Sequence, residues 1–86
     1  MDKIIKIIVL SSGKTLITQI VEFDPIELGA PDWRLINPYS ISNGDIIEPW
    51  LESCTDQTEF KIVSDIILTA IEPNSDLLEK YLEKIN

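Results

Sequence analysis

The sequence contains no histidine and only one cysteine, Cys54, among its 86 residues. Without histidine the chain lacks the most common general base and metal ligand of proteins, and a histidine-dependent catalytic triad is excluded. A single cysteine cannot form a disulfide within the chain, and here it also lacks the histidine partner that would activate it as a nucleophile. We therefore expect a protein without enzymatic activity, metal centre or cofactor, in a reducing compartment.

Basic residues are also scarce, since seven Lys and Arg stand against fifteen Asp and Glu, for a formal net charge of −8. Such a charge repels the phosphates of nucleic acids and anionic membrane surfaces, and it suits a basic protein partner. No apolar run is long enough to cross a bilayer, and the short run after Met1 is interrupted by Lys6, unlike a signal peptide. The pattern predicts a cytoplasmic protein that does not act at a membrane.

The chain is short but rich in apolar residues, which make up 44% of it. A domain of this length buries only about 60–65% of the surface that its unfolded chain exposes. Small scaffolds with apolar surface to spare commonly bury it against other subunits. We expect a single domain over residues 1–86 that forms a homo-oligomer.

Five segments are expected to form strands, and they cover 4–10, 15–23, 33–42, 46–51 and 66–71, with a further short extended piece at 60–63. The first two are dense in β-branched residues, which favour strands. Gly13 and the pair Asn43-Gly44 are hairpin turn signals, and Pro38 marks an edge, bend or bulge in its strand. Both alternating faces of 15–23 are apolar, as in a barrel strand that also contacts a neighbouring subunit.

A helix is expected over about 75–85, because Asn74 or Ser75 can cap it and Asp76 suits its first turn. Its apolar residues share one face at helical spacing: Leu77, Leu78, Tyr81, Leu82 and Ile85. Asp76 and Lys80 are one turn apart and form a favourable pair. The sequence therefore predicts a mainly β fold, a small open barrel over about 3–72 followed by a C-terminal α-helix.

Two short motifs raise a question of chemistry. Gly13-Lys14-Thr15 resembles the end of a phosphate-binding loop, but Ile8 occupies the position of the first glycine and a β-branched run follows where a helix is needed. Gly13 is therefore interpreted as a hairpin turn. Trp33 beside Arg34 permits two readings: a stacking clamp for a nucleobase, or a packed tryptophan next to an arginine paired with an acid.

The first hairpin resembles the first signature of the Sm-like (LSm) family. Leu10 ends the first strand, Gly13 makes the turn, and Phe23 with Asp24 closes the second strand. Thr18 stands where the family has a second glycine, and Val63-Ser64 replaces the Arg-Gly of the second signature.

The centre and tail are similar to small phage-encoded Sm-like proteins of the cyanophage type, through the segments Leu35-Ile36-Asn37-Pro38, Pro49-Trp50, Glu72-Pro73 and Leu77-Leu78 to Tyr81. The resemblance implies a strongly bent, five-stranded open β-barrel. It also implies a closed homo-oligomeric ring, pentamer to heptamer, in which the fourth strand of one subunit pairs with the fifth of the next. A phage-encoded chain would work in the cytoplasm of the host cell.

The resemblance further implies RNA as a ligand. Asp24 matches the aspartate of the family's uridine pocket, residues 25–32 look like an insertion, and Trp33-Arg34 falls where the family has its Met-Asn pair. Asp24, Trp33 and Arg34 are therefore the candidate RNA-binding residues. The alternative is a structural or protein-interaction ring that does not bind RNA.

Overall fold

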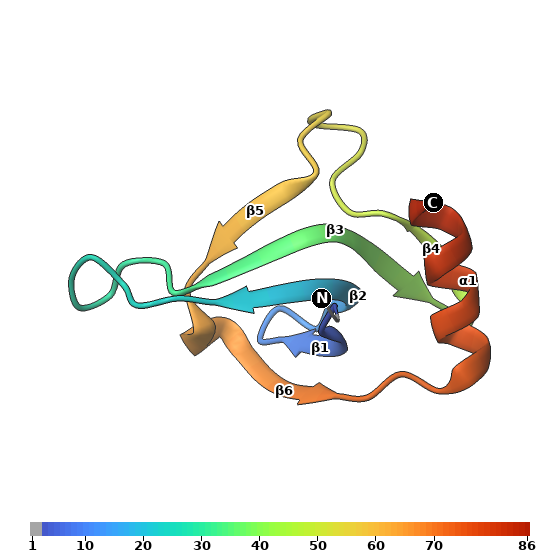
Figure 1. Ribbon diagram of the computed structural model, residues 1–86, viewed down its shortest axis with the longest axis horizontal. Coiled ribbons are helices and arrows are strands. Elements are labelled where there is room, and N and C mark those ends of the chain that lie inside the picture. Colours follow the sequence, from blue (N-terminus) through green and yellow to red (C-terminus); the bar gives the residue numbers. More distant parts are fainter. Residues whose placement is uncertain (1–2) are drawn as a thin grey trace.

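The structure, a computed structural model, describes residues 3–86. It consists of one antiparallel sheet and one helix (Figure 1). The strands are β1 (Ile5–Leu10), β2 (Thr15–Glu22), β3 (Trp33–Ser42), β4 (Ile46–Pro49), β5 (Glu59–Ile62) and β6 (Ile67–Ile71), with a 3₁₀ turn η1 (Ser64–Ile66) before β6 and the helix α1 (Ser75–Ile85) after it. The mainly β class with a C-terminal helix agrees with the sequence prediction. The structure has six strands where five were expected, because the short extended piece near 60–63 forms a strand of its own.

The strands follow the order β4-β3-β2-β1-β6, and β5 pairs with β3 as well. The long strand β3 serves both, because residues 33–36 pair with β5 and residues 39–42 pair with β4. Within residues 3–86 no strand pairing joins β5 to β6, so the sheet stays open. Its two ends are therefore β6 on one side and β4 with β5 on the other.

Two tight turns set the register of the hairpins. Gly13 has φ +93°, and its N–H donates to the Leu10 carbonyl at 2.9 Å, which closes the β1–β2 hairpin. Asn43 and Gly44 have φ values of 53° and 82° and join β3 to β4. Positive φ at both central residues matches the twist of a two-stranded hairpin. Gly13 turns a hairpin, as predicted.

A bulge bends β3 where the sequence carries proline. Asn37 and Pro38 lie opposite the single residue Thr18 of β2, and Asn37 has φ 52°. Thr18 is fully buried, and its hydroxyl donates to the carbonyls of Gln19 at 2.9 Å and Ile36 at 3.2 Å. A bulge of this kind leaves backbone groups of the ladder in need of other partners.

Tyr81 of α1 supplies the missing partner at the bulge. Its hydroxyl accepts the Gln19 N–H at 3.2 Å and lies 2.8 Å from the Asn37 carbonyl oxygen and 3.2 Å from that of Ile36. The side chain is fully buried, and this burial raises the pKa of Tyr81 to about 12. Tyr81 therefore anchors a helix of eleven residues that would be marginal in isolation.

Apolar side chains are buried on both faces of the sheet. Ile8, Leu10, Leu16, Ile20 and Leu35 form the core on one face, with Trp33 and Trp50 packed against it; Ile17, Ile47, Leu77 and Tyr81 form the core on the other. The second core lies under α1, so the chain's own helix covers this face of β2. Part of the apolar alternation of β2 is thus explained within the chain, and the contact with a neighbouring subunit stays a prediction.

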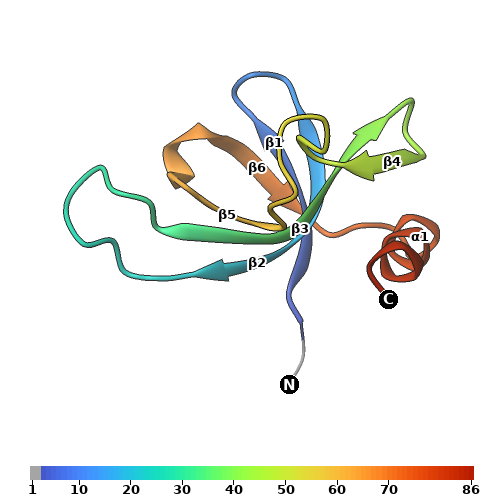
Figure 2. The ribbon, with the colours of Figure 1, turned by 90° about the horizontal axis from the view of Figure 1, so that it is seen from above.

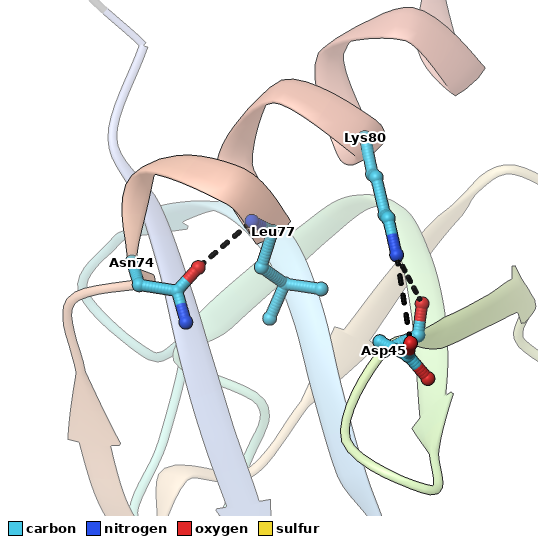
Figure 3. Close-up of polar contacts among 4 residues, drawn as sticks. All are labelled: Asp45, Asn74, Leu77 and Lys80. Carbon is cyan, nitrogen blue, oxygen red and sulfur yellow. Dashed lines mark hydrogen bonds and ion pairs between the residues drawn. The ribbon is translucent and has the colours of Figure 1, made fainter.

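The helix begins and docks through two polar contacts (Figure 3). The side-chain oxygen of Asn74 accepts the N–H of Leu77 at 2.8 Å, which identifies Asn74 as the N-cap. Lys80 donates to the Asp45 carbonyl at 3.2 Å, and its ammonium lies 3.9 Å from the Asp45 carboxylate. The expected pair of Lys80 with Asp76 is thus replaced by a tertiary contact with the β3–β4 turn.

Candidate functional site

β6 forms one open end of the sheet. It pairs with β1 on one side, and within the described chain no strand pairs with its other side. Its side chains are largely exposed, including Leu68 at 68% and Ile71 at 49%. An edge strand with unpaired backbone groups and exposed aliphatic side chains is a template for pairing with another strand. β6 is therefore the strongest candidate for a contact with a second chain.

The opposite end of the sheet is formed by β4 and β5. Each pairs with β3 alone among the described strands. β5 alternates exposed Glu59 and Lys61 with half-buried Phe60 and Ile62, and Phe60 packs edge-on to Trp50 with ring centroids 5.3 Å apart. Both edges of the sheet are therefore available for pairing with a strand of another copy.

The structure places Trp33 and Arg34 on opposite faces of β3, since consecutive side chains of a strand alternate. Trp33 is half-buried and packs against the core that contains Ile8, Leu16 and Leu35. Arg34 lies on the other face, and its guanidinium is 3.6 Å from the Glu59 carboxylate of β5. Of the two readings, the packed tryptophan beside a paired arginine describes this arrangement; the structure does not bring the two side chains together as a clamp.

Arg34 borders a shallow pocket of about 490 Å³ together with Gln57, Glu59, Phe60 and Lys61. Its Nε is buried and has no hydrogen-bond partner among the described residues. The side chain as a whole is 42% exposed, so Arg34 is in contact with solvent as well as with Glu59. The pocket thus carries both charges, two bases and one acid.

Residues 23–32 form a long loop, here called the arm, that projects away from the sheet in both views (Figures 1 and 2). Asp24, the third candidate RNA-binding residue, is exposed at the start of the arm. Ile26 and Leu28 follow, with exposures of 96% and 103%. The structure therefore leaves Asp24 on the arm, separate from the packed face of Trp33.

Asp32 fastens the base of the arm. Phe23 donates its N–H to the Asp32 carbonyl at 2.9 Å, and the Asp32 carboxylate accepts the Ser64 hydroxyl at 2.7 Å and the Ser64 N–H at 2.8 Å. These hydrogen bonds from Ser64 lower the pKa of Asp32 below its usual value. The contact links the arm to η1, at the turn that leads into β6.

Three further features of the described part of the chain concern metal binding, free thiols and membrane-spanning helices. Residues 3–86 contain no cluster of three or more Asp, Glu or Cys side chains placed to hold a metal ion. Cys54 lies exposed in the loop after β4. The only helix within the same residues, α1, is too short to cross a membrane.

Several surface features escaped the sequence analysis. The openness of β6 depends on which strands pair, and a single sequence does not state pairings beyond hairpins. The exposure of Ile26 and Leu28 could have been inferred from the sequence, because these two aliphatic residues flank Glu27 in a loop that contains two prolines. The Asp32–Ser64 contact joins residues 32 positions apart and left none.

Comparison with known proteins identifies the family of the chain. No curated protein sequence matches the chain. A family model described as a family of unknown function (DUF6561) matches residues 3–86, so the chain belongs to the DUF6561 family.

Proposed function

We propose that this chain is a non-enzymatic assembly protein whose copies join through the open ends of their sheets into a closed ring. The ring presents an acidic surface, and its partner is a basic protein. The single observation that carries the proposal is the exposed outer edge of β6, where Leu68 is 68% exposed in a strand with one vacant side among the described residues.

The geometry of the sheet supports the proposal of a closed ring. β6 forms one edge of the sheet, and β4 and β5 form the other. A contact between the β6 edge of one copy and the opposite edge of the next is therefore heterologous, and it generates a ring when the rotation from copy to copy closes on itself. Closure also removes the free edges that invite uncontrolled aggregation. The Sm-like resemblance of Leu10, Gly13, Phe23 and Asp24 supports the same arrangement, because rings of that family are joined by their edge strands.

Charge supports a protein partner over RNA. Each copy carries a net charge of −8, and a ring multiplies this charge on one body. Three of the seven basic side chains, Lys6, Arg34 and Lys80, are held in ion pairs with acids. RNA remains a prediction drawn from the resemblance, and nucleic acid bound to the purified protein would appear as extra mass in a native spectrum.

The variant Leu68→Lys tests the assembly. A lysine on an edge strand disfavours pairing with another strand, so sedimentation velocity should show the ring shifted to monomers. Leu51→Lys is the matched control, because Leu51 is also an exposed leucine, at 41%, but lies in the loop after β4. The proposal fails when Leu68→Lys sediments like the wild type, or when the wild type itself is a monomer.

A further inference from the structure

The arm ends in an apolar tip that no part of residues 3–86 covers. Ile26 and Leu28 are 96% and 103% exposed, and Glu27 lies between them. A turn closed by the Ala30 N–H on the Glu27 carbonyl at 3.0 Å holds the tip, with Gly29 at φ +86°. Scattered single aliphatic residues are common on surfaces, but two fully exposed ones at one projecting tip mark an interaction site.

A groove of about 1060 Å³ lies beside the base of the arm. Its apolar lining comes from five parts of the chain and includes Ile4, Val21, Trp33, Ala70 and Leu78. Ile4 is 56% exposed and Val21 37% exposed, so a second apolar surface is open to solvent there. The groove and the arm tip are thus two unpartnered apolar features of the same chain.

The arm and the groove differ in charge. The arm, residues 23–32, contains Asp24, Glu27 and Asp32 and no basic residue. The groove is lined by two bases, Lys3 and Lys6, and by two acids, Glu22 and Glu72, so its formal charge is zero. Lys6 is paired with Glu72, whereas Lys3 makes no ion pair with any acid of residues 3–86. Lys3 is thus the cation open to a carboxylate from outside.

We propose that the arm of one copy docks in the groove of a second copy, with Ile26 and Leu28 on the apolar lining and Glu27 facing Lys3. Glu22 and Trp33 line the groove and also flank the arm as the last residue of β2 and the first of β3. The arm therefore leaves from the rim of the groove. Two copies related by a two-fold axis can each place an arm in the other's groove, which doubles the contact.

This pairing goes beyond the edge-to-edge ring, because it uses the arm and the groove. Of the residues of β6, Ala70 lines the groove, whereas Leu68 does not. Combined with the ring, it joins two rings; without the ring, it gives a dimer. An anionic membrane surface is a poor alternative occupant for an arm with three acids and no base on a body of charge −8.

The test compares the masses of Ile26→Ser/Leu28→Ser and the wild type by native mass spectrometry and by sedimentation velocity over a concentration series. Both residues are exposed, so the fold is retained, and the largest species should fall to half its mass. Removing two buried aliphatic contacts should weaken the pairing by about a hundredfold. Leu51→Ser, which removes an exposed leucine from another loop, is the control and should behave like the wild type.

Charge reversal adds a second test of the same contact. Glu27→Lys and Lys3→Glu should each weaken the pairing, and the two changes together should restore it, because the pair is rebuilt with opposite signs. The inference is overturned when the arm variant keeps the wild-type mass at every concentration, or when the double reversal is no tighter than either single change. The Leu68→Lys variant separates the two proposals, because it removes the ring contact and leaves the arm contact intact. A dimer of Leu68→Lys that dissociates when Ile26→Ser and Leu28→Ser are added would support the arm contact independently of the ring.

Discussion

Replacing Tyr81 by phenylalanine removes one oxygen atom from the bulge between β2 and β3. In the wild type this hydroxyl accepts the Gln19 N–H at 3.2 Å and contacts the carbonyls of Asn37 and Ile36 at 2.8 and 3.2 Å. Phenylalanine keeps the ring and its packing against the second core, but it leaves these backbone groups without their partner. A buried donor or acceptor left unpaired costs about 1–3 kcal/mol, so we expect the free energy of unfolding to fall by about 2 kcal/mol.

The assay is urea unfolding followed by circular dichroism, at one protein concentration for all variants because assembly also adds to stability. The urea concentration at the unfolding midpoint should fall, with an unchanged dependence of the free energy on urea concentration. The Tm should fall by about 8 to 16 °C for a domain of this size. Tyr39→Phe is the matched control. The Tyr39 hydroxyl is exposed and makes only a long contact of 3.4 Å with the Lys84 carbonyl, so its loss should change stability by less than about 0.5 kcal/mol.

Alkaline pH gives the same residue a second readout. Burial raises the pKa of Tyr81 to about 12, from the 10.0 of an exposed tyrosine. A raised pKa means that the folded state holds its proton more tightly than the unfolded state. The stabilisation is then complete below pH 10 and is lost as the pH rises to about 12. Tyr81→Phe should lack this loss, and a variant with wild-type stability and an unchanged alkaline transition would refute the anchoring role of Tyr81.

The remaining predictions concern the two other side chains that fasten a segment. Asn74→Ala removes the acceptor for the Leu77 N–H, so unfolding should become easier by about 1 kcal/mol, whereas Asn74→Asp retains the cap. For Asp32, hydrogen bonds from Ser64 lower the pKa from 3.8, so its stabilisation is present above that pH and is lost as the pH falls further. In Asp32→Asn the free energy of unfolding, measured by urea unfolding at a series of acidic pH values, should fall less steeply with decreasing pH. A pH dependence identical to that of the wild type would contradict the contact.

Short-range sequence signals predicted several elements of the fold. Gly13 and Asn43-Gly44 demand positive φ, so two hairpins could be placed from the sequence, and Pro38 marked the bulge because it cannot donate to a ladder. The C-terminal helix followed from its cap and the spacing of Leu77 and Tyr81. These features are set by neighbours within a few residues of each other, which is the range that a sequence pattern describes.

Long-range pairings were out of reach for the same reason. The apolar alternation of 15–23 showed that both faces of β2 are covered, but alternation does not identify the covering element, and the structure shows it to be α1. For Lys80, the helical spacing favoured an ion pair with Asp76, one turn away in the sequence. In the structure Lys80 pairs instead with Asp45 of the β3–β4 turn, because the helix docks there. For the candidate site, Trp33 and Arg34 are neighbours in sequence, yet the strand directs them to opposite faces.

A native mass spectrum of the untagged wild-type protein at low salt tests the central claim most directly. Pairing through the open ends of the sheet predicts a closed ring of about five to seven copies, or two such rings joined. A species without bound nucleic acid would fit the protein-partner proposal. A monomer, or a dimer with no larger species, would contradict the ring.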